Sequence, residues 1–295
     1  MCENEEINGV SRDGGCECLP FHSFSFFFLP CRFQQSTTPS SFSLFRTFFR
    51  GSSSPCSTSN PIENSPVHSL DQSARLHSSD AEYLLLRSNA GVRIPKELPP
   101  AEYAPFLCAG VTVFNSIRNM NIPKGELVAV QGLGGLGHLA IQYASKMGYR
   151  VVALSSSSSK ESFARDLGAS EYLDGSKVNH TEGLQKLGGA ALIVSTAPNP
   201  QAMSELQGGL EAMGKLLLLS PSGDVTIDTI SLVTKGLTVC GWPSGHAKDS
   251  EEALAFAAEH KIKCLVETFP LEKANEGFEA MKAGKVRFRS VLVVE

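Results

Sequence analysis

One glycine-rich stretch decides the fold of this chain: Gly132-Leu133-Gly134-Gly135-Leu136-Gly137, which follows the apolar run Leu127–Val130. G-x-G-x-x-G between a strand and a helix is the fingerprint of a dinucleotide-binding βαβ unit. The first glycine allows a tight turn, the second lets a pyrophosphate approach the backbone, and the third lets the helix pack on the strand. The helix start offers free N–H groups to the phosphates. We therefore expect this stretch, including Gly135 and Leu136, to bind a dinucleotide.

The residues that follow carry the periods of alternating helices and strands. From Leu136 to Met147 the apolar residues fall on one helical face, Gly148 ends that helix, and Arg150–Leu154 is a second strand. Continuously apolar strands are typical of a parallel sheet that is covered on both faces, so we predict an α/β, doubly wound parallel sheet. Further predicted helices span 101–120, 160–167, 201–213 and 250–260, and further strands 83–87, 171–173, 190–196, 215–220, 237–241 and 264–268.

Composition restricts the partners of this 295-residue chain. The net charge of −4 gives no reason to expect nucleic acid or an anionic membrane surface, and no apolar run is long enough for a transmembrane helix. The eight cysteines are scattered and lack the spacing of a zinc module. We expect a cytoplasmic protein with reduced cysteines.

Residues 1–79 differ from the rest of the chain. Ser, Thr, Pro and Phe dominate this segment, and no period of 2 or 3.6 is sustained. We expect it to be disordered, or to be an aberrant, low-complexity translated segment.

A resemblance becomes visible at Ala104–Phe114, APFLCAGVTVF. There the chain resembles the zinc-containing alcohol dehydrogenases of the medium-chain dehydrogenase/reductase superfamily, especially fungal, yeast-like and cinnamyl-alcohol-dehydrogenase-like members. The likeness extends over residues 80–295, through 132–138, 195–198, 241–245 and 284–292. It implies a remnant of the GroES-like catalytic domain at 80–107, a Rossmann domain at 108–264, and a return segment of the catalytic domain at 265–295.

The resemblance gives roles to individual residues. Cys108 matches the third catalytic zinc ligand, Thr112 a residue near the nicotinamide, and Arg289 a basic residue that reaches the pyrophosphate. Without the resemblance these residues have simpler interpretations. Cys108 would be a small core residue, Thr112 an ordinary helix residue, and Arg289 a charge at the edge of a strand. Further cofactor-binding candidates are Thr196, Ala197 and Ser220.

Two of the three catalytic zinc ligands are not found. The family's Cys-His and Gly-His-Glu segments do not occur, and His22, His68 and His77 stand in other contexts. Catalytic zinc needs three protein ligands and one open position. We therefore expect an incomplete zinc site at Cys108, no bound zinc, and a truncated, catalytically impaired chain. The apolar residues Phe269, Phe278, Leu292 and Val293 would then lie exposed on a poorly supported return segment.

The residues that follow the second strand indicate whether the cofactor is NAD(H) or NADP(H). An Asp or Glu that binds the ribose hydroxyls usually follows this strand when NAD is the ligand. Here Ser155 and Ser156 take that place, and Lys160 lies near enough to neutralise a 2′-phosphate. We favour NADP(H) over NAD(H), although a solvated serine-rich turn would have the same sequence.

Three functions remain open. The first is an NADP-dependent alcohol dehydrogenase that acts on a small alcohol or aldehyde, and the second is a non-catalytic dinucleotide-binding pseudoenzyme. The third, a zinc-independent quinone or enoyl reductase of the same superfamily, leaves the match at Cys108 unexplained. A homo-oligomer is compatible with all three.

Overall fold

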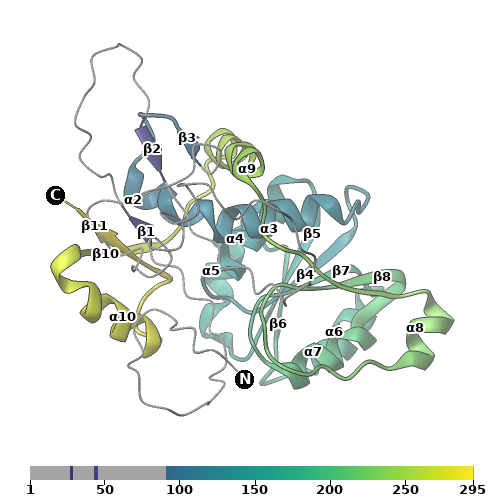
Figure 1. Cartoon of the computed structure of the whole chain (residues 1–295). Helices are drawn as coiled ribbons and strands as arrows, with labels where there is room; N and C mark the ends of the chain where they lie inside the picture. The colour runs from purple at the N-terminus through teal and green to yellow at the C-terminus, as the bar shows by residue number, and fades with distance from the viewer. Residues whose placement is uncertain (1–26, 29–42, 46–90, 295) are drawn as a thin grey trace, which may run out of the picture.

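The computed structural model describes residues 27–28, 43–45 and 91–294. Its centre is a six-stranded, all-parallel sheet in the order β6-β5-β4-β7-β8-β9 (Figure 1), which confirms the predicted doubly wound sheet. The strands are β4 (Leu127–Gln131), β5 (Arg150–Ser155), β6 (Glu171–Asp174), β7 (Ala190–Ser195), β8 (Leu210–Leu218) and β9 (Thr238–Gly241).

Alternate residues of each strand pack against different helical layers. Val128 and Val130 of β4 contribute to one core, and Leu127 and Ala129 contribute to the other. Helices therefore exclude solvent from both faces of the sheet, which explains why β4 and β7 are buried along their whole length. The first layer contains α3 (Ala109–Asn119), α4 (Gly137–Lys146), α5 (Glu161–Asp166) and α9 (Ala247–His260), and the second contains α6 (His180–Lys186), α7 (Pro200–Leu206) and α8 (Thr229–Lys235).

The strand order places a crevice at the carboxyl ends of β4 and β7. The chain leaves β4 towards β5 on one side and later returns to pair β7 on the other. Ligands of doubly wound sheets bind outside the strand ends at such a switch point. The glycine-rich loop 132–137 lies directly after β4, so the fold positions it for binding.

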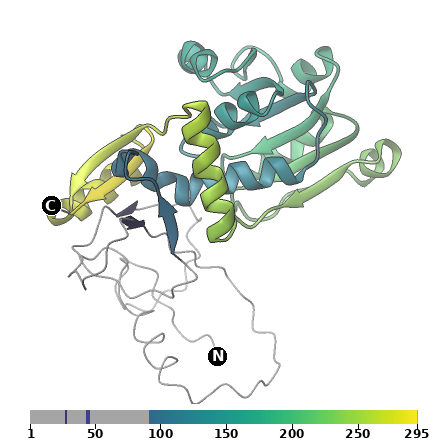
Figure 2. The same ribbon diagram turned by 90° about the horizontal axis from the view of Figure 1, so that it is seen from above.

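A smaller unit lies beside the sheet, on the left in Figure 2. Strand β11 (Arg289–Val293) pairs in parallel with β10 (Val266–Pro270) and with β1 (Phe27–Phe28), and α10 (Ala274–Lys282) packs on both β10 and β11. Strand β2 (Ser43–Phe45) pairs with β3 (Val92–Ile94). Both β1 and β2 fall inside the segment for which the sequence predicts disorder.

The expected exposed apolar face of the return segment is not present. Leu292 is completely buried, and Phe269, Phe278 and Val293 are each half-buried. The expectation was wrong because β11 is buried on both of its faces, and Val291 belongs to the main hydrophobic core.

Two predicted helices were wrong in their extent. The helix predicted over 101–120 is divided into α2 (Pro100–Tyr103), a 3-10 turn (Ala104–Leu107) and α3, because Pro105 lacks an N–H and Cys108 leaves the helical conformation. The helix predicted over 201–213 ends at Leu206, since a second 3-10 turn (Gln207–Gly209) leads into β8.

Other differences are smaller. The strand predicted at 264–268 begins two residues later, as β10, and helices α6, α8 and α10 had not been predicted. The predicted strand 83–87 lies outside the described residues. Within the described part of the chain, no helix is both long and apolar enough to cross a membrane.

We predict that the third glycine of the motif is essential for folding. A methyl group on Gly137 would lie 1.8 Å from the carbonyl oxygen of Gly132, whereas a methyl group on Gly134 would meet nothing within 4 Å. Gly137→Ala should therefore lower the free energy of unfolding by about 3 kcal/mol or more, and Gly134→Ala by less than about 1 kcal/mol. Urea unfolding measures both, and equal midpoints for the two variants would contradict this prediction.

Candidate functional site

The glycine-rich loop begins with a turn that only glycine accommodates. Gly132 has a φ of +91°, and its N–H donates to the carbonyl of Leu154 at the end of β5 (3.1 Å). A methyl group there would lie 2.8 Å from the Cβ of Ala197. The turn is thus fixed between the ends of β5 and β7.

Gln131 joins the ends of β4 and β7. Its Oε1 accepts hydrogen bonds from the Ser195 hydroxyl (2.8 Å) and the Ala197 N–H (3.2 Å). Its backbone carbonyl accepts from the N–H and the hydroxyl of Thr196 (2.9 and 2.8 Å). The predicted residues Thr196 and Ala197 therefore lie beside the loop, where they support its first turn. Gln131 itself was not predicted.

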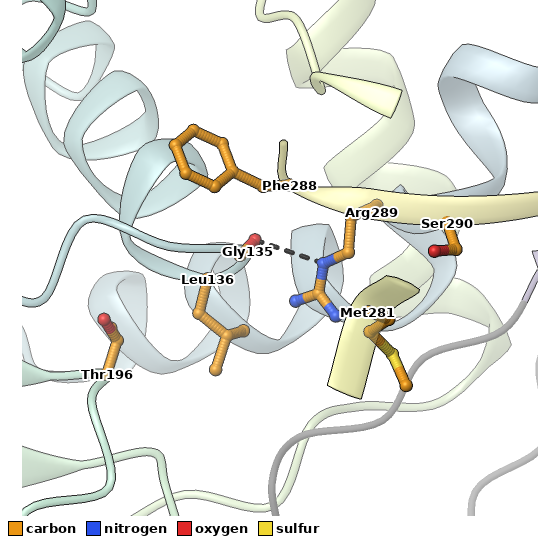
Figure 3. Close-up of a pocket in the computed structure, with 7 residues that line it drawn as sticks. All are labelled: Gly135, Leu136, Thr196, Met281, Phe288, Arg289 and Ser290. Carbon is orange, nitrogen blue, oxygen red and sulfur yellow. Dashed lines mark hydrogen bonds between the residues drawn. The ribbon is translucent and has the colours of Figure 1, made fainter. Parts of the chain in front are cut away.

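Arg289 reaches the same loop from the far end of the sequence (Figure 3). Its Nε lies 3.4 Å from the carbonyl oxygen of Gly135, and a methyl group on Gly135 would lie 2.6 Å from that Nε. Only 5% of Arg289 is exposed, and burial lowers the pKa of its guanidinium. In the described part of the chain it forms no ion pair. A buried cation that has no counter-ion among the described residues fits an anionic ligand.

A cavity of about 110 Å³ lies beside this guanidinium. The loop contributes two of its lining residues, and the others come from β7's end, α10 and the start of β11 (Figure 3). The lining consists of Gly135, Leu136, Thr196, Met281, Phe288, Arg289 and Ser290.

The serine-rich turn after β5 also contacts the loop. Ser155 is buried at the strand end, Ser156 is exposed, and Lys160 Nζ donates to the carbonyl of Leu133 (3.2 Å). The structure thus brings Lys160 to the glycine-rich loop, and its role towards a 2′-phosphate stays a prediction. Asp174 of β6 pairs in register with Ser155, but its Oδ1 accepts from the N–H and hydroxyl of Ser176.

Ser220 follows β8 at the same edge of the sheet. Its hydroxyl is buried, and among the described residues it has no hydrogen-bond partner. A buried hydroxyl without a partner is costly, so Ser220 fits a site that takes a polar ligand. The residues present therefore fit a dinucleotide.

Cys108 and Thr112 lie at the start of α3. Cys108 is half-buried and lies near enough to Arg289 to affect the pKa of that guanidinium. The Thr112 hydroxyl donates to that of Ser244 (3.0 Å). The described residues contain no group of three or more metal-ligating side chains, so they do not by themselves fit a catalytic zinc.

Comparison with known proteins identifies the family. The model of the zinc-binding dehydrogenase family matches residues 135–259 of this chain. An alcohol dehydrogenase, patD, of Penicillium expansum is 60% identical over 214 residues, which cover 72% of this chain and 63% of the relative. The patD alcohol dehydrogenase of Aspergillus clavatus is 51% identical over 262 residues and covers 73% of this chain and 68% of the relative. The chain belongs to the zinc-binding alcohol dehydrogenase family. It spans about two thirds of the length of these relatives.

Solved structures share the fold. A cinnamyl alcohol dehydrogenase of Sorghum bicolor is 30% identical, with 71% of this chain and 60% of that chain covered and a TM-score of 0.63. A Helicobacter pylori cinnamyl alcohol dehydrogenase, solved with NADP(H), is 26% identical over 69% of this chain and 58% of that one, with a TM-score of 0.59. Acetophenone reductase of Geotrichum candidum, solved with NAD, is 22% identical over 72% and 61%, with a TM-score of 0.63.

His138 follows the last glycine of the motif and was not predicted as a site residue. Its ring is completely buried, and this burial lowers its pKa to about 4. The nearby charge of Arg289 also lowers the pKa, and hydrogen bonds to Gly134 and Gly135 oppose the shift. Its place on the buried face of α4 was the signal available in the sequence.

We predict that His138 makes the stability of the protein depend on pH. Its folded pKa of about 4 lies below the model-peptide value of 6.5, so the unfolded chain binds the proton more tightly. The stabilisation is complete above pH 6.5 and is lost as the pH falls towards 4, by about 3 kcal/mol. Urea unfolding between pH 7 and pH 4.5 should show a smaller decline for His138→Gln than for the natural chain, whereas parallel curves would contradict the assignment.

Proposed function

We propose that this chain binds NADP(H) at the loop 132–137 as the cofactor-binding part of an alcohol dehydrogenase for a small alcohol or aldehyde, and that its own catalysis is impaired. The observation that carries the proposal is the buried guanidinium of Arg289 against Gly135, without an ion pair in the described part of the chain. A pyrophosphate would supply the missing negative charge. The N–H groups at the start of α4 would bind the same phosphates.

The turn after β5 supports the choice of NADP(H). Ser155 and Ser156 present no carboxylate to a 2′-phosphate, and Lys160 already lies across the loop at Leu133. In Asp174, Oδ1 accepts hydrogen bonds from Ser176 and Oδ2 lies 3.5 Å from Lys177 Nζ, so a lysine already offsets the charge of this carboxylate. Charge-assisted hydrogen bonds from Lys160 would favour the phosphorylated cofactor.

The remaining cofactor candidates frame the switch point of the sheet. Ser220 offers a buried hydroxyl at the end of β8, and Thr196 and Ala197 hold the end of β7 beside Gly132. When bound, the nicotinamide supplies the hydride chemistry, while the protein supplies binding and orientation. The described residues offer Cys108 but no group of three ligands, so they do not by themselves hold a catalytic zinc.

We expect NADPH to bind more tightly than NADH, and Lys160 to account for most of the difference. Lys160→Ala should weaken NADPH binding about tenfold and leave NADH binding nearly unchanged. Ser155→Asp should reverse the preference by repelling the 2′-phosphate. Fluorescence titration gives the dissociation constants, and Lys146→Ala, an exposed lysine at the other end of α4, is the matched control. Equal affinities of the natural chain for both cofactors would contradict the proposal.

We also expect dinucleotide binding to be independent of metal. Treatment with a zinc chelator and the substitution Cys108→Ser should both leave the dissociation constant of NADPH within about twofold, because neither removes a proposed phosphate ligand. Metal analysis and a turnover assay with several primary alcohols accompany the titration, and we expect neither stoichiometric zinc nor turnover. Turnover that disappears in Cys108→Ser would show that the chain completes a zinc site.

A further inference from the structure

Two side chains of α4 hold the backbone that links the main sheet to the return segment. Gln142 forms a two-way pair with Lys263: its Nε2 donates to the Lys263 carbonyl (2.8 Å) and its Oε1 accepts from the Lys263 N–H (3.0 Å). One helical turn earlier, His138 Nε2 meets the N–H of Leu265 (3.3 Å). The two residues are four apart, so they lie on one face of the helix.

The partners of His138 determine its tautomer. Leu265 offers an N–H, so Nε2 must be unprotonated in order to accept it. The proton is then on Nδ1, which donates to the carbonyl of Gly134 (2.9 Å). One neutral imidazole therefore connects the second glycine of the loop to the backbone of the return segment. Protonation or the other tautomer would break the bond to Leu265.

The connection continues to Arg289. The carbonyl of Leu265 accepts hydrogen bonds from the N–H groups of Phe288 (3.0 Å) and Arg289 (3.2 Å). The ring of Phe288 lies over that of His138, with 5.0 Å between the ring centres. The position of His138 thus determines both the backbone of Arg289, through Leu265, and the side chain of the preceding residue, Phe288.

We propose that His138 is a positioning residue for dinucleotide binding: through Leu265 it sets the start of β11, and with it the guanidinium of Arg289, over the glycine-rich loop. This proposal rests on the proposed function, because it makes phosphate affinity the property that His138 controls. His138 does not itself touch the cofactor, since both of its ring nitrogens are engaged by protein groups.

Three substitutions distinguish the effects of the two hydrogen bonds that the His138 imidazole forms. In His138→Gln the amide oxygen can replace Nε2 and accept from Leu265. In His138→Asn the shorter side chain can replace Nδ1 but does not reach Leu265, and His138→Phe keeps only the ring. We expect NADPH affinity close to that of the natural chain in the Gln variant and a loss of about tenfold in the Asn and Phe variants. His260→Phe on α9 is the matched control.

A double-mutant cycle with Arg289 distinguishes positioning from general destabilisation. In an Arg289→Ala background, His138→Asn should cause no further loss of NADPH affinity, because the group that it positions is absent. Additive losses, or equal affinities of the Asn and Gln variants in the natural background, would overturn the proposal. The cycle remains informative if the Phe variant does not fold.

Amide hydrogen exchange tests the connection without any cofactor. The N–H groups of Leu265 and Arg289 should exchange faster in His138→Asn than in His138→Gln, and the N–H of Ser170 on the far side of β5 should not change. Unchanged exchange at Leu265 and Arg289 would overturn the positioning role. If exchange responds as expected but the natural chain binds neither NADPH nor NADH, the proposed function fails while the structural connection stands.

Discussion

The contact between Gly137 and the carbonyl oxygen of Gly132 is the constraint on which the site depends. Because no side chain fits between these residues, α4 starts directly against the turn that leaves β4. This position directs the free N–H groups of the helix towards the crevice at the strand ends. It also fixes the rotation of α4, so that His138 and Gln142 face the segment 263–265. One steric contact thus orients both the phosphate site and the support behind it.

Two positively charged side chains at the glycine-rich loop add an electrostatic component to the phosphate site that we propose. Arg289 is buried against a glycine carbonyl and forms no ion pair with the described residues, and burial of an unpaired guanidinium is unfavourable. Lys160, at the end of the serine-rich turn, donates a hydrogen bond to the carbonyl of Leu133 in the same loop. The two cations lie on different chain segments and contact the same loop at different carbonyl groups. Two cations at one loop attract an anion, which is the physical basis of the phosphate site that we propose.

The sequence predicted what short-range patterns determine. The strand–glycine–helix unit and the apolar strands appear in the structure because both follow from local period and from burial on two faces. The helix predicted over 201–213 was wrong because β8 starts as an irregular strand: Leu210 pairs with Ala190, and Met213 takes a φ of +64° before regular pairing resumes at Lys215. The residues at an apolar, irregular start of a strand show no period of 2. Their sequence therefore does not distinguish them from the end of a helix.

The site was predictable only where its residues are neighbours in sequence. The glycines, Ser155 and Lys160 belong to one βαβ unit, and their proximity follows from that unit. Arg289 lies 154 positions from Gly135 and was reached through a family resemblance, not through any pattern in its own segment. His138 stands next to the motif, yet its role depends on Leu265, a distant backbone N–H that no local period reveals. Where a function joins two distant segments, the residue that connects them is therefore found from the hydrogen bonds of the folded chain.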